Sequence, residues 1–254
     1  MTARPHLNPT GRFSDRVEDY VRYRPSYPAV AVDHVLTGLG EPAHLRAADV
    51  GAGTGIWTAL LAARGVRVQA VEPNAAMRGA APVLPGVEWL PGTAEATGLP
   101  ESSVRLVTVA QAFHWFEPEK ALREFRRVLA ADGRLALIWN RRDKNDAFSK
   151  GYRDAILEVE GESSVERMDF DPALLTAEDE FTVPVAVRFL HVQELDRAGL
   201  HGRARSASYV PKRGARAHRL IDMLDTLFDR YHDARGLVTL RYACEVWTAD
   251  PVRG

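Results

Sequence analysis

The alternation of short apolar runs with helical stretches between Leu45 and Asn140 is the feature that most constrains the fold. Runs rich in apolar and β-branched residues, typical of buried strands, recur at Leu45–Val50, Val66–Glu72, Val87–Leu90, Val104–Ala110 and Leu135–Asn140. Strands that alternate with helices pair in parallel through right-handed crossovers, and the helices then cover both faces of the sheet. The sequence therefore predicts a doubly wound α/β fold with a mostly parallel sheet.

Further elements flank this alternation on both sides. A helix behind Ser14 ends where Arg24 meets Pro25, and a second helical stripe ends at Gly40. After the alternation, the pattern predicts a helix near Ala147–Glu160, a strand near Val183–Val192, a helix near Ile221–Asp233 and a strand over Leu237–Trp247. We expect the two late strands to extend the sheet at one edge as an antiparallel pair, which gives seven strands.

Composition and charge exclude several classes of protein. With 46% hydrophobic and 26% charged residues, the chain is typical of a globular protein rather than a disordered one. Cys244 is the only cysteine, which excludes intramolecular disulfides and thiolate zinc sites, and we expect no metal. The 33 Lys and Arg nearly cancel the 34 Asp and Glu, so no overall field favours nucleic acid, although one stretch, Arg197–Arg219, is basic.

The amino terminus has no apolar stretch that could form the core of a signal peptide, and no run of 18 apolar residues could span a bilayer. We therefore expect a cytoplasmic protein without a membrane segment. The sequence predicts no oligomeric state.

A glycine loop at the end of the first strand indicates a nucleotide-like ligand. The run Asp49-Val50-Gly51-Ala52-Gly53-Thr54-Gly55 lets the backbone turn tightly and lets a ligand approach it. A dinucleotide fingerprint would have a third glycine where Ile56 stands, and no Lys-Ser/Thr of a phosphate-binding loop follows. Glu72, 21 positions after Gly51, can accept hydrogen bonds from both ribose hydroxyls of an adenosine.

These residues resemble the motifs of class I S-adenosylmethionine-dependent methyltransferases, which have a Rossmann-like fold. The likeness rests on D-V-G-A-G-T-G, on V-E-P-N at the second strand, on Gly92–Glu95, on the fourth-strand motif Val107–Phe116 and on the segment Ala121–Trp139. Within this class, Tyr20–Pro28 together with Gln111–Trp115 is most similar to the type 11, trans-aconitate methyltransferase-like branch.

The resemblance implies S-adenosyl-L-methionine as cofactor and assigns roles along the chain. The loop from Asp49 to Gly55 would surround the methionine part, Glu72 would hold the ribose, and Pro73, Met77 and Glu95 would flank the adenine. The complete set of expected cofactor residues is Tyr20, Arg24, Asp49, Gly51, Ala52, Gly53, Thr54, Gly55, Glu72, Pro73, Met77, Thr93, Ala94, Glu95, Gln111 and Ala112.

For the methyl acceptor, we expect contacts with Tyr27, Trp115, Trp139 and Arg141, and His114 is the candidate base or substrate ligand. A histidine that packs against Trp115 is the alternative reading of His114. We expect one methyltransferase domain over residues 1–254, in which residues 1–40 form a helical lid, residues 41–140 the cofactor-binding core, and residues 141–254 complete the sheet and the acceptor pocket.

The sequence thus predicts a methyltransferase that acts on a small molecule, with carboxylate O-methylation as the first candidate reaction. Two alternatives stay open: a nucleic-acid methyltransferase and an NAD-linked oxidoreductase, the second weakened by Ile56.

Overall fold

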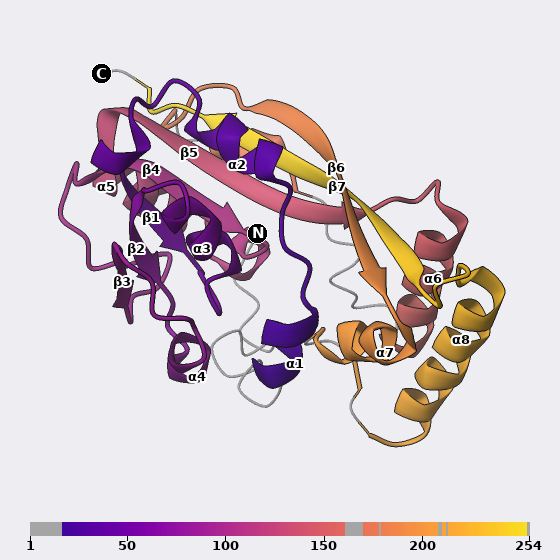
Figure 1. The fold of residues 1–254 in the computed structure, drawn as a ribbon. Helices are drawn as coiled ribbons and strands as arrows, with labels where there is room; N and C mark the ends of the chain where they lie inside the picture. Colours follow the sequence, from indigo (N-terminus) through magenta and orange to yellow (C-terminus); the bar gives the residue numbers. More distant parts are fainter. Residues whose placement is uncertain (1–16, 161–169, 178, 208–209, 212, 253–254) are drawn as a thin grey trace.

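The structure is a computed structural model, and it describes residues 17–160, 170–177, 179–207, 210–211 and 213–252. Its centre is a seven-stranded sheet in the order β3-β2-β1-β4-β5-β7-β6 (Figure 1). The strands are β1 (Arg46–Val50), β2 (Arg67–Val71), β3 (Val87–Leu90), β4 (Val104–Ala110), β5 (Leu129–Arg142), β6 (Val185–Leu195) and β7 (Val238–Ala249). This arrangement confirms the predicted doubly wound fold.

The first five strands are parallel, and β7 runs antiparallel to both of its neighbours, β5 and β6. The edge strand β6 therefore joins the sheet through an antiparallel pair, as the sequence predicted. β5 is longer than its predicted range because Leu129 pairs with Val104 before the register shifts, and Arg134 then pairs with Leu106.

The helices are α1 (Val17–Tyr23), α2 (Ala29–Leu36), α3 (Ile56–Ala62), α4 (Ala75–Gly79), α5 (Pro118–Val128), α6 (Ala147–Glu160), α7 (Arg197–Arg205) and α8 (Ala215–Tyr231). The sequence analysis did not predict α7, because its short segment carries two glycines and little apolar periodicity. Its first turn is instead fixed by Asp196, whose Oδ1 accepts a hydrogen bond from the Gly199 N–H at 2.7 Å.

Alternation along the strands divides the core between the two faces of the sheet. Leu106 packs with α2 and α3, whereas its neighbour Val107 packs with α5 on the other face. A third cluster joins α6, α7 and α8 to the amino-terminal end of β7. The central strands β1 and β4 are thus buried on both faces, and they form a rigid support for the loops at their carboxyl ends.

The strand order reverses between β1 and β4, so their crossovers leave in opposite directions and a crevice opens at their carboxyl ends. Among the described residues, no helix has the length and apolar character needed to span a membrane.

Candidate functional site

The glycine loop turns sharply between β1 and α3. Gly51, Gly53 and Gly55 have φ values of +70°, +61° and +82°, which side chains rarely tolerate. At Gly51 there is a second constraint, because a Cβ there would lie 2.6 Å from the Cβ of Ala112, in the loop after β4. The two loops can approach this closely only because position 51 has no side chain.

Glu72 connects the glycine loop to the loop that follows β2. Its Oε2 accepts a hydrogen bond from the Gly53 N–H at 2.9 Å, and its Oε1 accepts one from the Asn74 N–H at 2.8 Å. Burial raises the pKa of Glu72, and the two backbone hydrogen bonds oppose that rise. Each carboxylate oxygen keeps a lone pair for a ligand hydroxyl.

Asp49 is buried below the glycine loop, at the end of β1. The Thr58 hydroxyl donates to its Oδ2 at 2.6 Å and the Thr108 hydroxyl to its Oδ1 at 3.0 Å. Burial raises the pKa of Asp49 to about 6, although both hydroxyls stabilise the charged form. The carboxylate is therefore held in place by α3 and β4 before any ligand binds.

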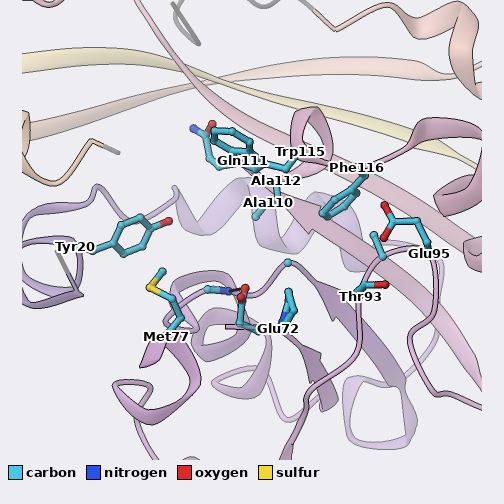
Figure 2. A pocket seen from close by; sticks show the side chains of 14 residues that line it. Tyr20, Glu72, Met77, Thr93, Glu95, Ala110, Gln111, Ala112, Trp115 and Phe116 are labelled. Atoms are coloured by element: carbon cyan, nitrogen blue, oxygen red, sulfur yellow. Dashed lines mark hydrogen bonds between the residues drawn. The ribbon is translucent and has the colours of Figure 1, made fainter. Parts of the chain in front are cut away.

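A pocket opens at the carboxyl ends of β1, β2 and β4 (Figure 2). Tyr20 and Met77 lie at one end, Thr93 and Glu95 at the other, and Glu72 between them. The residues that line it are Tyr20, Gly51, Gly53, Glu72, Pro73, Met77, Thr93, Ala94, Glu95, Ala110, Gln111, Ala112, Trp115 and Phe116.

A smaller cavity shares Tyr20, Gly51 and Ala110 with this pocket. The residues that line it are Tyr20, Tyr27, Asp49, Gly51, Ala52, Ile56, Trp57 and Ala110. Tyr27 meets Trp57 edge-on, with 5.0 Å between the ring centroids, and both side chains are buried. The small cavity therefore carries a fixed carboxylate and fixed aromatic walls.

The two cavities bring together thirteen of the sixteen expected cofactor residues, namely Tyr20, Asp49, Gly51, Ala52, Gly53, Glu72, Pro73, Met77, Thr93, Ala94, Glu95, Gln111 and Ala112. Arg24, Thr54 and Gly55 line neither cavity. Gly55 is instead the N-cap of α3, and a Cβ there would lie 3.0 Å from the Trp89 ring.

Sequence reasoning missed Ile56, Ala110 and Phe116 as cavity residues. Ala110 is the last residue of β4, and a strand end at the switch point could have indicated it. Phe116 packs beside the position where a Gly51 Cβ would lie, at 3.0 Å, a proximity that no sequence spacing shows.

Hydrogen bonds with neighbouring residues fix two of the side chains that line the pocket. Glu95 Oε1 accepts a hydrogen bond from the Glu117 N–H at 2.9 Å, at the start of α5. Gln111 has a φ of +57°, and its Nε2 donates to the Asn140 carbonyl at 3.2 Å. A non-glycine residue with positive φ at a pocket is a strained conformation of the kind that marks functional sites.

The residues expected to contact the acceptor divide into two groups. Trp115 lines the main pocket and Tyr27 the small cavity. Trp139 instead stacks on Phe170 at 4.9 Å, and the Arg141 Nε donates to Glu245 Oε2 at 3.2 Å. The structure does not bring these last two residues into either described cavity.

His114 lines neither described cavity, and its ring lies 4.7 Å from that of Trp115, centroid to centroid. It belongs to the 3₁₀ turn Phe113–Trp115. This position agrees with the alternative reading, a histidine that packs against Trp115.

The basic stretch Arg197–Arg219 is partly neutralised by acidic side chains. Arg197 forms ion pairs with Asp225 and Asp229, and Arg219 forms one with Glu158. Residues 208, 209 and 212 of this stretch lie outside the described residues.

The expected lid, residues 1–40, is described from residue 17 onward, and its first helix rests on the carboxyl-terminal part of the chain. The Gln193 Nε2 donates to the Tyr23 carbonyl at 2.9 Å, and the Arg24 guanidinium donates to the Ser206 carbonyl at 3.3 Å. The Tyr23 ring fills a notch at Gly202, where a Cβ would lie 2.2 Å from a ring carbon. α7 therefore supports the helix that brings Tyr20 to the pocket.

Comparisons with known proteins relate part of the chain to methyltransferases. Residues 48–137 match the type 11 family model described as "Methyltransferase domain". The chain is 45% identical to an uncharacterized methyltransferase of Mycobacterium tuberculosis over 133 residues, which are 52% of this chain and 53% of that protein. The chain thus spans about half the length of the curated relatives that it matches.

Two solved structures show the same fold. A protein of Anabaena variabilis described as a "Putative methyltransferase from antibiotic biosynthesis pathway" has a TM-score of 0.66 and 24% identity, over 90% of this chain and 99% of that chain. Geranyl diphosphate methyltransferase in complex with SAM has a TM-score of 0.50 and 13% identity, over 99% of this chain and 97% of that chain.

Residues 48–137 are thus similar to a methyltransferase domain, and the described chain has the Rossmann-like fold of these two solved structures. The finer likeness to the trans-aconitate methyltransferase-like branch stays a prediction.

The buried carboxyl of Asp49 predicts a pH dependence. The pKa of Asp49 is raised from 3.8 to about 6 in the folded chain. Between about pH 4 and pH 6, Asp49 therefore holds a proton in the folded chain that it has lost in the unfolded chain. Stability from this group is present at low pH and is lost as the pH rises through that window. Relative to the Asp49→Asn variant, the wild type should lose about 2 kcal/mol of unfolding free energy between pH 4 and pH 7.

Urea unfolding of both proteins at the two pH values measures this difference. The exposed Glu41 provides the control: Glu41→Gln should stay within about 0.5 kcal/mol of wild type at either pH. A constant difference between wild type and Asp49→Asn would show that Asp49 titrates as an exposed carboxyl does.

The Gly202 notch predicts a remote effect on α1. In Gly202→Ala, the new Cβ must displace the Tyr23 ring, so the segment around Arg22 should become more accessible. Trypsin should cleave after Arg22 several times faster than in wild type, whereas the control Gly79→Ala, where a Cβ meets nothing within 4 Å, should cleave at the wild-type rate. Equal rates in all three proteins would mean that Tyr23 moves without loosening the helix.

Proposed function

We propose that this chain is an S-adenosylmethionine-dependent methyltransferase that acts on a small molecule. The observation that carries the proposal is the position of Glu72, whose carboxylate ties the Gly53 loop to the Asn74 loop and lines the pocket at the switch point. The methyltransferase domain match covers this segment.

The residues present fit the cofactor at both ends of the pocket. Glu72 has two lone pairs free for ribose hydroxyls, while Met77 and Ala94 offer apolar contacts for a flat base. The small cavity has the Asp49 carboxylate in its wall, which suits the ammonium group at the amino-acid end of the cofactor. Gly51 keeps open the space between these ends, since a Cβ there would meet Ala112.

When bound, the cofactor supplies an electrophilic methyl group on a sulfonium. Positive charge disappears as the methyl group moves, so this chain has mainly to align the two reactants and exclude water. Tyr20, Trp115 and Phe116 provide uncharged aromatic walls for that purpose.

The lining of the two described cavities includes no histidine or lysine that could act as a base, and its acidic residues are Asp49, Glu72 and Glu95. We therefore propose an acceptor that is already ionised and needs no such base. A carboxylate, with a pKa of roughly 4, needs no base at neutral pH, whereas a phenol or an ammonium must lose a proton first. Carboxylate O-methylation is therefore the reaction that we propose, and a phenol, an amine or a nucleic acid is the competing acceptor.

Cofactor binding tests the first part of the proposal. S-adenosylhomocysteine should bind the wild type, and Glu72→Ala should weaken its binding at least 100-fold, because two hydrogen bonds to a charged group are lost at about 1.5–3 kcal/mol each. Glu88, exposed on the neighbouring strand β3, is the matched control, and Glu88→Ala should bind like wild type.

Titration calorimetry with S-adenosylhomocysteine and with NAD gives both affinities, and thermal unfolding reports whether each variant folds. Binding of NAD without S-adenosylhomocysteine would reject the methyltransferase proposal. Unchanged affinity in a folded Glu72→Ala variant would remove Glu72 from the ribose.

A panel of acceptors tests the second part. With S-adenosylmethionine as donor, we expect methyl esters from di- or tricarboxylic acids and no turnover of phenols, amines or a tRNA mixture. Product analysis by mass spectrometry identifies the methylated class. Turnover confined to phenols or amines would reject the carboxylate acceptor, and turnover of tRNA alone would reject the small-molecule proposal.

A further inference from the structure

The edge strand β6 is long, and its outer side is unpaired along the part of the chain that the structure describes. It runs over eleven residues, Val185–Leu195, and no described strand pairs with its outer side. Its pairing with β7 is continuous from Val185 to Leu195, with neither a bulge nor a proline within it. Natural proteins use such devices to prevent edge-to-edge pairing, and a strand without them is a template for another strand.

One face of β6 is both exposed and partly apolar. Its even-numbered residues, which share a face, are all exposed. Among them, Leu190 has 68% and Val192 has 44% of its surface accessible, which is unusual for large apolar side chains side by side. Arg188 and Glu194 flank this apolar pair with opposite charges.

We propose that β6 pairs antiparallel with β6 of a second copy of this chain, with His191 of the two copies opposite each other. A two-fold axis at His191 places Leu190 opposite Val192 of the second copy, and Arg188 opposite Glu194 of the second copy. Each contact occurs twice because of the symmetry. The apolar pairs thus lie at the centre and the ion pairs at both ends of the interface.

The neighbouring charges extend this complementarity. Within one chain, Arg188 Nε donates to Glu245 Oε1 at 2.9 Å, and Glu194 forms an ion pair with Arg235. In the paired strands, charges would alternate along the row Arg235, Glu194, Arg188 and Glu245, with the last two contributed by the second copy. Opposite charges across paired strands stabilise a sheet, and like charges destabilise it.

Other registers are less favourable. Only alternate residues of a strand direct their N–H and C=O groups to its free side, and in an antiparallel pair these residues must lie opposite one another. The two-fold axis of a symmetric pair therefore passes through a residue, and another register moves the axis to another residue. An axis at Leu190 would place Arg188 opposite Val192, and an axis at Val192 would place Glu194 opposite Leu190. Each of these registers sets a charge against an apolar side chain.

Charge reversal in the full-length chain tests the proposal by sedimentation equilibrium. We expect a dimer for the wild type at micromolar concentration. Arg188→Glu and Glu194→Arg should each weaken dimerisation at least tenfold, because each creates two like-charge contacts across the axis. The double variant, Arg188→Glu with Glu194→Arg, should dimerise more tightly than either single variant because the charges across the axis are again opposite. It should not reach the wild-type affinity, because each new side chain meets a like charge, Glu245 or Arg235, within its own chain.

The exposed Val83, in the loop between α4 and β3, provides the control: Val83→Lys should dimerise like wild type. All these positions are exposed, and thermal unfolding would report any variant that fails to fold. A monomeric wild type at about 100 μM would overturn the proposal. A wild-type dimer that persists in both single variants would place the interface elsewhere and overturn it equally.

Discussion

The carboxylate of Glu72 is the interaction on which the site depends. It accepts one N–H from the glycine loop and one from the loop before α4, so two loops from neighbouring strands are held in one geometry. These N–H groups would otherwise be partly buried without partners, at a cost of about 1–3 kcal/mol each. Both loops therefore keep their conformation without a ligand, and the pocket is formed in advance.

A second carboxylate, that of Asp49, lies in the wall of the small cavity. Its two hydroxyl donors come from α3 and β4, on either side of the switch point. Burial works against its ionisation, as the raised pKa shows. A cation in the adjoining cavity would favour the charged form, so ligand binding and the protonation of Asp49 are linked. The buried Asp49 carboxylate thus lowers the free energy of unfolding at neutral pH.

The wall that carries Tyr20 depends on residues far away in the sequence. Tyr23 sits in the Gly202 notch, and its carbonyl accepts a hydrogen bond from Gln193 on β6. The late elements of the chain therefore support the amino-terminal helix, which contributes Tyr20 to the pocket. This arrangement separates Asp49 and Glu72, at the carboxyl ends of β1 and β2, from the wall that Tyr20 provides.

The sequence by itself determined that the sheet is doubly wound and mostly parallel. It also identified many of the residues that line the pocket. The bounds of β3, β4 and α6 agree with the predicted ranges, because apolar periodicity and local propensity agree there. Asp49, the glycines and Glu72 could be found because tight turns and charged groups leave a signature at fixed spacing.

Only the tertiary structure decided the rest. Trp139 stacks on Phe170, and Arg141 donates a hydrogen bond to Glu245 on the neighbouring strand β7. α7 forms around a glycine because the Tyr23 ring needs that space. Such contacts join residues whose separation along the chain is large, and a local pattern carries no information about them.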